Sequence, residues 1–227
     1  MRLALLMLVM LFVNYTQFKF PALPKVDEKK RITEAQTQRV IENLQKKPEW
    51  LFTGDDCPAD IMPEIEKKIE YQAEGCAGDP DKCLEKCQAD DANACYALSS
   101  LLDEQREKEA ADTQALYLRA CKLGISSGCT NNAAGKLNAA PDDEKTAKCA
   151  ADTFEKTCSH DDSWGCTMYG TAWALGSGRP RNIDEAQKYL QKACVKFGDP
   201  SPACQSARKT EELIKNQKDN SSNVNKP

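Results

Sequence analysis

The sequence predicts an all-α fold, a right-handed solenoid of αα-hairpins clamped by disulfides within each hairpin. Its cysteines form four pairs whose first members lie 34, 37 and 36 positions apart. Seven residues separate the members of the first three pairs and nine those of the last, so a cysteine ending one helix can bond one that begins the next. Units of this length bury their apolar faces by stacking on neighbours. The pairs are Cys87 with Cys95, Cys121 with Cys129, Cys158 with Cys166, and Cys194 with Cys204.

Residues 1–20 are a hydrophobic segment, predicted to be a membrane anchor or a signal segment. The apolar run Leu3 to Val13 has the length of a secretory h-region and is too short to span ~30 Å of hydrocarbon. Extended to Phe20, it is long enough for an anchor, and the absence of a small-x-small cleavage site favours that interpretation. The basic residues that follow favour a domain on the reducing side of the membrane, but we give the paired cysteines greater weight.

Residues 21–60 are predicted to be a linker with one short helix. A capping box of Thr33 and Gln36 marks the start of that helix, whose apolar stripe is Val40, Ile41 and Leu44. The cluster Trp50–Phe52 follows, and then a turn at Gly54–Pro58. A helix from Pro63 to Glu74 is expected to open the repeat domain, residues 61–215. The polar tail, residues 216–227, is expected to be disordered.

The helix before each first cysteine carries one apolar face. Counted back from that cysteine, positions −8, −4 and −1 lie on the same side of a helix, which is predicted to be buried. Cations at position −2 lie on the opposite side, near the helix end, where they complement its dipole. Small residues four positions after the second cysteine (Ser99, Ala133 and Gly170) allow helices to approach closely. Position −8 holds Thr113, Ala150 and Ala186; position −4 holds Cys83, Tyr117, Phe154 and Leu190; position −1 holds Ala120, Thr157 and Ala193; position −2 holds Arg119, Lys156 and Lys192.

Composition narrows the possible functions. The net charge of −4 gives no reason to expect nucleic acid as a partner. Twelve cysteines with regular pairing indicate an oxidising compartment, and a single histidine with no C-x2-C motif argues against zinc. His160 falls in a predicted surface turn, which is a poor setting for a Ser-His-Asp or Cys-His arrangement. The sequence therefore predicts a non-catalytic protein with no metal site and no cofactor.

Four cysteines fall outside the period: Cys57, Cys76, Cys83 and Cys149. Cys83 occupies an apolar −4 position, so we expect it to face inward and to pair with Cys76 or Cys57. Cys149 lies at position −9, where other units carry Asp112 and Glu185, so we expect it to be exposed. An exposed cysteine outside the pattern is either half of a further disulfide or a reactive thiol.

The stretch Asn182–Cys204, preceded by Gly165–Gly170 and Gly176–Gly178, resembles the TPR-like hairpin of Sel-1-like repeat proteins. In that family, cysteines bridge the two helices of a unit, and the resemblance extends over roughly Glu64 to Lys215. One cysteine-rich branch is secreted and bacterial. The other is mitochondrial, of the cytochrome c oxidase assembly factor 7 type. The opening Cys83-x3-Cys87, followed by Cys95-Tyr96, resembles the mitochondrial branch.

The resemblance implies a scaffold in the mitochondrial intermembrane space, associated with the inner membrane through the N-terminal segment. Its partners would be protein subunits of a respiratory-chain complex, cytochrome c oxidase, for which it would be an accessory subunit or assembly factor. Two alternatives stay open. One is an assembly factor that exchanges disulfides with its clients, and the other is a secreted or periplasmic bacterial repeat protein.

Overall fold

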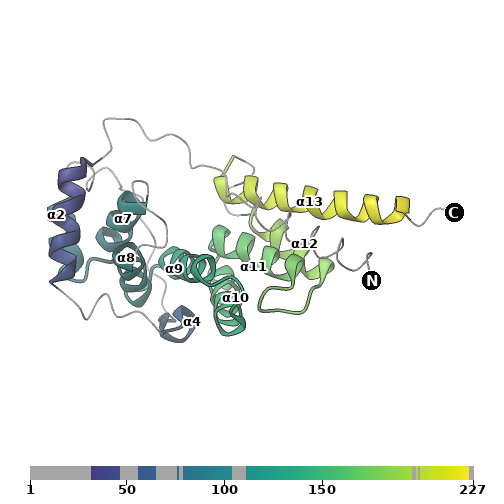
Figure 1. Cartoon of the computed structure of the whole chain (residues 1–227), viewed down its shortest axis with the longest axis horizontal. Coiled ribbons are helices and arrows are strands. Elements are labelled where there is room, and N and C mark those ends of the chain that lie inside the picture. Colours follow the sequence, from purple (N-terminus) through teal and green to yellow (C-terminus); the bar gives the residue numbers. More distant parts are fainter. Residues whose placement is uncertain are drawn as a thin grey trace, which may run out of the picture.

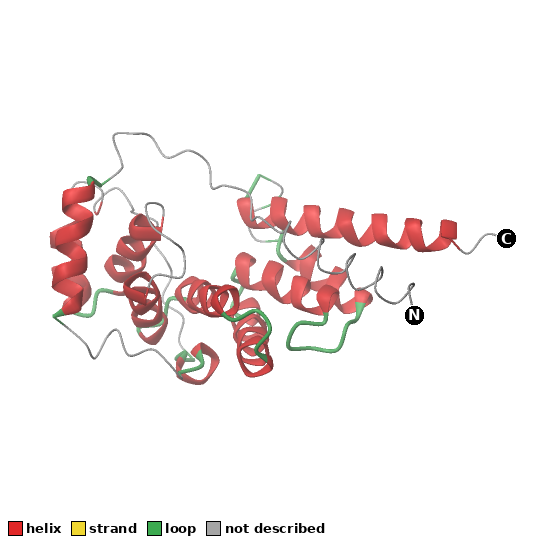
Figure 2. Cartoon of the chain, in the orientation of Figure 1, coloured by secondary structure: helices red, strands yellow, loops and turns green. Residues whose placement is uncertain are grey.

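The computed structural model describes residues 32–46, 56–64, 76, 79–103, 111–195, 198 and 200–224. Within these ranges the chain is all-helical, as predicted (Figures 1 and 2). The helices are α2 (Glu34–Gln45), α4 (Pro58–Ile61), α6 (Pro80–Gln88), α7 (Ala92–Asp103), α8 (Ala111–Lys122), α9 (Ser126–Ala139), α10 (Glu144–Ser159), α11 (Ser163–Leu175), α12 (Ile183–Lys192) and α13 (Pro202–Val224).

Four helix hairpins follow one another from α6 to α13. They are α6–α7, α8–α9, α10–α11 and α12–α13, and each helix also packs against the next along the chain. Figure 1 shows them in succession along the long axis, from the α2 end to the α13 end. Each predicted cysteine pair forms a disulfide where the two helices of its hairpin meet. The pairs are Cys87–Cys95, Cys121–Cys129, Cys158–Cys166 and Cys194–Cys204.

The predicted inner face of the first helix in each hairpin is buried. Every residue named at positions −8, −4 and −1 lies in the core, including Phe154 and Leu190 with 1% and 0% of their surfaces exposed. These positions share one side of a helix because 3.6 residues make a turn. The apolar side that they form packs against the neighbouring helices. The helical period therefore identified the core correctly.

Small residues bring successive hairpins close together. The Ser99 hydroxyl donates a 2.7 Å hydrogen bond to the Thr113 carbonyl on the next hairpin. A Cβ at Gly170 would lie 2.7 Å from Cγ of Leu190, so only glycine permits this separation of α11 and α12. Glycines also close the hairpins themselves, since a Cβ at Gly165 would lie 2.2 Å from the Thr157 hydroxyl. The predicted role of these small residues is confirmed at Ser99 and Gly170.

Helix α2 begins as the sequence predicts. The Thr33 side chain accepts a hydrogen bond from the Gln36 amide, and the Gln36 side chain accepts one from the Thr33 amide, which completes the capping box. Its stripe of Val40, Ile41 and Leu44 is buried, and the helix packs against α6.

Other expectations differ from the structure or fall outside it. Helix α13 continues to Val224, well into the tail that was expected to be disordered. Residues 205–224 contain no proline or glycine to stop a helix. The N-terminal segment 1–20, the cluster Trp50–Phe52 and the helix expected over most of Pro63–Glu74 lie outside the described residues. No described helix combines the length and apolar character that crossing a membrane requires.

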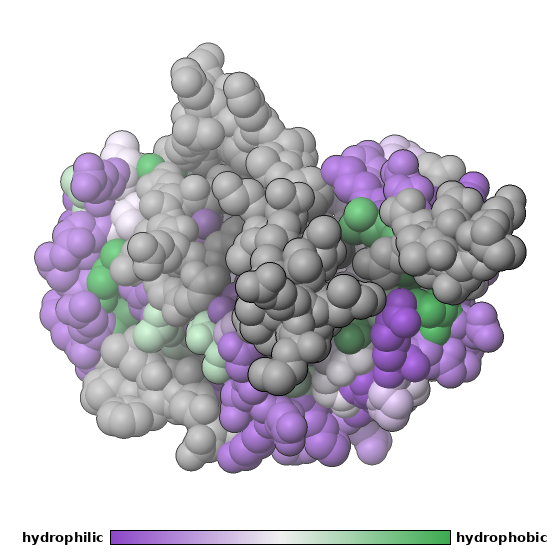
Figure 3. Space-filling model, turned by 45° about the vertical axis from the view of Figure 1, so that its right-hand side comes forward, coloured by the Kyte–Doolittle hydropathy of each residue, from purple (hydrophilic) through white to green (hydrophobic). Residues whose placement is uncertain are grey.

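Figure 3 shows hydrophilic residues over most of the described surface on that face, with smaller hydrophobic groups between them. Three large hydrophobic side chains of the described residues are clearly exposed: Leu175, Val195 and Leu213.

Candidate functional site

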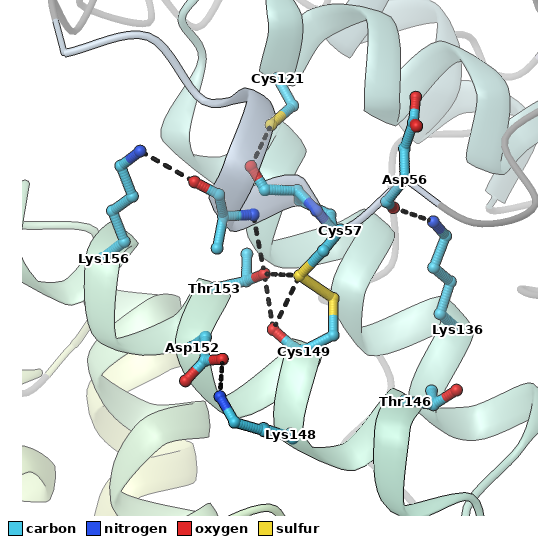
Figure 4. Close-up of a disulfide and its surroundings, with 12 residues drawn as sticks. Asp56, Cys57, Cys121, Lys136, Thr146, Lys148, Cys149, Asp152, Thr153 and Lys156 are labelled. Carbon is cyan, nitrogen blue, oxygen red and sulfur yellow. Dashed lines mark hydrogen bonds and ion pairs between the residues drawn. A yellow bond between two sulfur atoms is a disulfide. The ribbon is translucent and has the colours of Figure 1, made fainter.

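Residues 56–64, which we call the strap, lie across three helices far along the chain. The strap contains the short helix α4 and packs against α8, α9 and α10. Figure 4 shows it beside the Cys57–Cys149 disulfide, with lysine side chains reaching it from the helices. The sequence assigned most of this segment to a linker. A single helical turn is too short to show an apolar period, so its packing gave no sequence signal.

Most polar contacts of the strap go to its main chain. Lys136 Nζ donates to the Asp56 carbonyl at 2.5 Å. Lys156 Nζ donates to the carbonyls of Ala59 and Met62, both at 2.9 Å. The Ala59 amide in turn donates to the Thr153 hydroxyl at 3.2 Å. These bonds supply partners to backbone groups that a four-residue helix leaves unsatisfied.

Side chains at both ends of the strap add specific contacts. Met62 is buried beside the Cys121–Cys129 disulfide, with Ile61 packed against the same cluster. At the other end, the Asp56 carboxylate pairs with Lys122 Nζ at 3.1 Å. The strap therefore carries an acidic contact at one end and an apolar anchor at the other.

A disulfide between Cys57 and Cys149 fixes the strap to α10 across 92 positions of sequence. Both cysteines are half-buried, whereas every other disulfide has at least one buried cysteine. Cys57 Sγ lies 3.5 Å from the Cys149 carbonyl oxygen and 3.8 Å from the Thr153 hydroxyl. The expectation that Cys149 is exposed is wrong, because the strap covers this side of α10. Of the two roles left open for Cys149, the structure shows the further disulfide.

The remaining irregular cysteines are also paired. Cys83 faces inward and bonds Cys76, one of its two expected partners, and both are buried. All twelve cysteines of the chain are therefore in disulfides.

The cations at position −2 link one hairpin to the preceding one. Arg119 Nε donates to the Cys87 carbonyl at 3.1 Å, and Lys192 Nζ donates to the Cys158 carbonyl at 2.9 Å. An aspartate in the preceding turn faces each cation: Asp90 Oδ1 lies 2.5 Å from Arg119 and Asp161 Oδ1 3.9 Å from Lys192. These cations neutralise the carbonyl end of a neighbouring helix, an inter-hairpin contact that the sequence did not predict.

The central junction, between α8–α9 and α10–α11, departs from this pattern. Gly124 stands at the turn position that Asp90 and Asp161 occupy, and all three have positive φ angles. The corresponding cation, Lys156, bonds the strap carbonyls of Ala59 and Met62. The strap therefore accepts the bonds that the preceding turn accepts at the other two junctions.

Replacing Arg119 with methionine should lower the free energy of unfolding by about 1.5 kcal/mol, because a charged donor to a partly buried carbonyl is lost. Urea unfolding followed by circular dichroism measures this cost. The control is Arg39→Met, which removes an exposed 3.3 Å ion pair with Asp81 and should cost less than about 0.5 kcal/mol. Equal costs would contradict the proposed linking role of position −2.

A second polar cluster lies where the α11–α12 connector meets α10. Arg179 pairs with Asp152 at 2.5 Å and Glu155 at 2.9 Å, and lies over the Tyr169 ring. Burial disfavours the Arg179 charge, but bonds to Tyr169 and the two carboxylates outweigh it and raise its pKa. Burial would likewise raise the pKa of Asp152, but the bonds from Lys148 and Arg179 lower it below the usual carboxyl value.

A lowered pKa in the folded state means that Asp152 stabilises the protein above its unfolded pKa and loses this effect as the pH falls through the folded pKa. We expect Asp152→Asn to cost about 0.5 kcal/mol at pH 7, a small value because the pair is partly exposed. The cost should shrink as the pH falls below about 4. Unfolding measured at pH 7 and at low pH tests this; a cost that grows towards low pH would contradict it.

Aspartates in the turns between helices act as caps. Asp91 Oδ1 accepts from the amides of Asn93 and Ala94, and Asp162 Oδ1 accepts from the Trp164 amide. His160 is the half-buried C-cap of α10. The described residues contain no group of three or more His, Cys, Asp or Glu side chains placed to hold a metal ion.

Comparison of the chain with protein-family models, curated proteins and solved structures finds no match in any of the three.

Proposed function

We propose that this protein is a non-catalytic interaction scaffold built as a right-handed Sel-1-like solenoid. The observation that carries the proposal is the recurrence of one hairpin geometry. Each successive hairpin has its own disulfide where its two helices meet. The buried positions −8, −4 and −1 also recur from one hairpin to the next. Two junctions also share the cation-to-carbonyl bond. Stacked hairpins of this kind present extended surfaces that bind other proteins.

We place the scaffold in an oxidising compartment, because twelve paired cysteines persist where thiols are not kept reduced. The Cys83-x3-Cys87 opening favours the mitochondrial intermembrane space. The hydrophobic residues 1–20 would hold the protein at the inner membrane. Its partners are then subunits of a respiratory complex, cytochrome c oxidase by the resemblance.

Thiol trapping in intact cells, combined with fractionation, tests the compartment. The full chain should be fully oxidised and should fractionate with the inner mitochondrial membrane. Oxidised protein in the periplasm or medium would favour the secreted alternative. Protein with reduced thiols would overturn the proposal.

Affinity purification in non-ionic detergent tests the partner. Cytochrome c oxidase subunits should co-purify with the tagged chain, and not with an unrelated disulfide-rich protein that carries the same tag in the same compartment. Failure to recover these subunits would exclude cytochrome c oxidase as the partner, and it would not affect the result on the compartment.

A second candidate function is disulfide exchange with clients. The half-burial of both Cys57 and Cys149 favours this pair as the exchanging one. Loss of partner maturation in Cys57→Ser with Cys149→Ser, but not in Cys194→Ser with Cys204→Ser, would favour this function over a purely structural scaffold.

A further inference from the structure

The strap is held on α8, α9 and α10 in the way that a binding surface holds a short peptide. Bonds to three main-chain carbonyls and one amide provide sequence-tolerant attachment. Two side chains, Asp56 and Met62, make the contacts that select sequence. Main-chain bonds that give affinity, combined with side-chain sites that give specificity, are one established means of peptide recognition.

This surface lies at the junction where the repeating inter-hairpin contact is interrupted. Gly124 stands where the other two junctions have an aspartate, and Lys156 there bonds the strap carbonyls of Ala59 and Met62 at 2.9 Å. Lys122 supplies a second cation, which is paired with the Asp56 carboxylate. The junction therefore offers donors matched to an acidic segment with free backbone carbonyls.

The strap is attached so that it can be released without opening a hairpin. The five other disulfides include the four that clamp the hairpins, and none of them holds the strap to the helices. A thiolate that attacks Sγ of Cys149 forms a mixed disulfide and breaks the Cys57–Cys149 bond. Cys57 leaves as a thiolate and takes a proton from water, so the exchange needs no further oxidant or reductant.

We propose that the surface beneath the strap is a peptide-binding site that the strap occupies in the oxidised protein. Its occupant from another protein is a short segment that forms a single helical turn, with an acidic residue, a cysteine directly after it, and an unbranched apolar residue five positions beyond the cysteine. The partner's cysteine takes the place of Cys57 and bonds Cys149. The acidic residue pairs with Lys122, and the apolar side chain covers the Cys121–Cys129 disulfide. This proposal holds whichever compartment and partner the previous experiments identify.

Disulfide capture measures whether the site prefers a peptide with the strap sequence. The protein used is the full chain with Cys57→Ser and Met62→Ala, in which the strap lacks both its thiol and its apolar anchor. Its Cys149 is first converted to a mixed disulfide with 5-thio-2-nitrobenzoate. The probe is a synthetic peptide with the sequence of residues 55–64. It should displace nitrothiobenzoate about tenfold faster than a scrambled peptide with the cysteine in the same position, and the rate should saturate with peptide concentration.

A matched variant locates the effect. Adding Lys122→Met and Lys156→Met should abolish the difference between the two peptides, since these side chains make the acidic and carbonyl contacts. The proposal would be overturned if, in the first variant, both peptides displaced nitrothiobenzoate at equal rates that did not saturate with peptide concentration. If that variant does not retain its five other disulfides, the unmodified protein is incubated with each peptide and the adduct at Cys149 is quantified by mass spectrometry. A preference for the strap sequence supports the site, and equal adduct yields exclude it.

Discussion

Replacing both strap cysteines, Cys57→Ser with Cys149→Ser, should lower the free energy of unfolding by about 4 kcal/mol. The bond closes a loop across 92 positions, and chain-entropy stabilisation grows with loop length. Three shorter disulfides lie inside this loop and reduce its effective length, so the expected value is slightly below the ~4.7 kcal/mol of a free 100-residue loop. Urea unfolding followed by circular dichroism, without reductant, measures the difference.

The matched control is Cys194→Ser with Cys204→Ser, whose bond spans only 10 positions. The same entropy argument gives about 2.7 kcal/mol for this pair. If removing the strap disulfide lowered the free energy of unfolding no more than removing the hairpin disulfide, the strap disulfide would add no long-range constraint.

Gly178→Ala should cost about 3 kcal/mol or more, because two effects combine at this residue. Gly178 has a φ of 65°, a left-handed conformation that strains any residue with a Cβ. A Cβ there would also lie 2.1 Å from the Ala147 carbonyl oxygen, which belongs to the backbone of α10 and cannot rotate away. The α11–α12 connector would have to move off α10. Thermal unfolding should show a clearly lowered midpoint.

Gly198→Ala separates the two effects. Gly198 has a similar φ of 69°, but among the described residues the nearest atom to its added Cβ would be Pro200 Cδ at 3.7 Å, an ordinary contact. This variant should cost only the backbone strain, about 1 kcal/mol. If both alanine variants were equally destabilised, the close approach of the connector to α10 would be refuted.

Much of the fold follows from local chemistry that the sequence displays. Positions −8, −4 and −1 are spaced for one side of a helix, so Thr113, Phe154 and Ala193 were correctly expected to be buried. Capping depends on side chains within three residues of a helix end, and for this reason the capping box at Thr33 was also correctly predicted.

The candidate site was harder to predict because its contacts are non-local. Spacing alone cannot choose among distant cysteines, so the Cys57–Cys149 pairing had no counterpart in the sequence analysis. The carbonyl acceptors of Arg119 and Lys192 belong to the backbone, which every residue carries alike. One signal was present in the sequence: the turn position with Asp90 and Asp161 holds glycine at Gly124, which marks the junction that the strap fills.

The strap also restricts how this architecture can change its length. An array of stacked hairpins ordinarily gains or loses whole units, since each contacts only its neighbours. Here one short segment contacts Lys122 on α8, Lys136 on α9 and Lys156 on α10 at once. A hairpin inserted between α9 and α10 would separate these lysines beyond the reach of the strap. A hairpin added after α11 would leave the three lysines together, so the strap permits variation in the number of units on the α13 side.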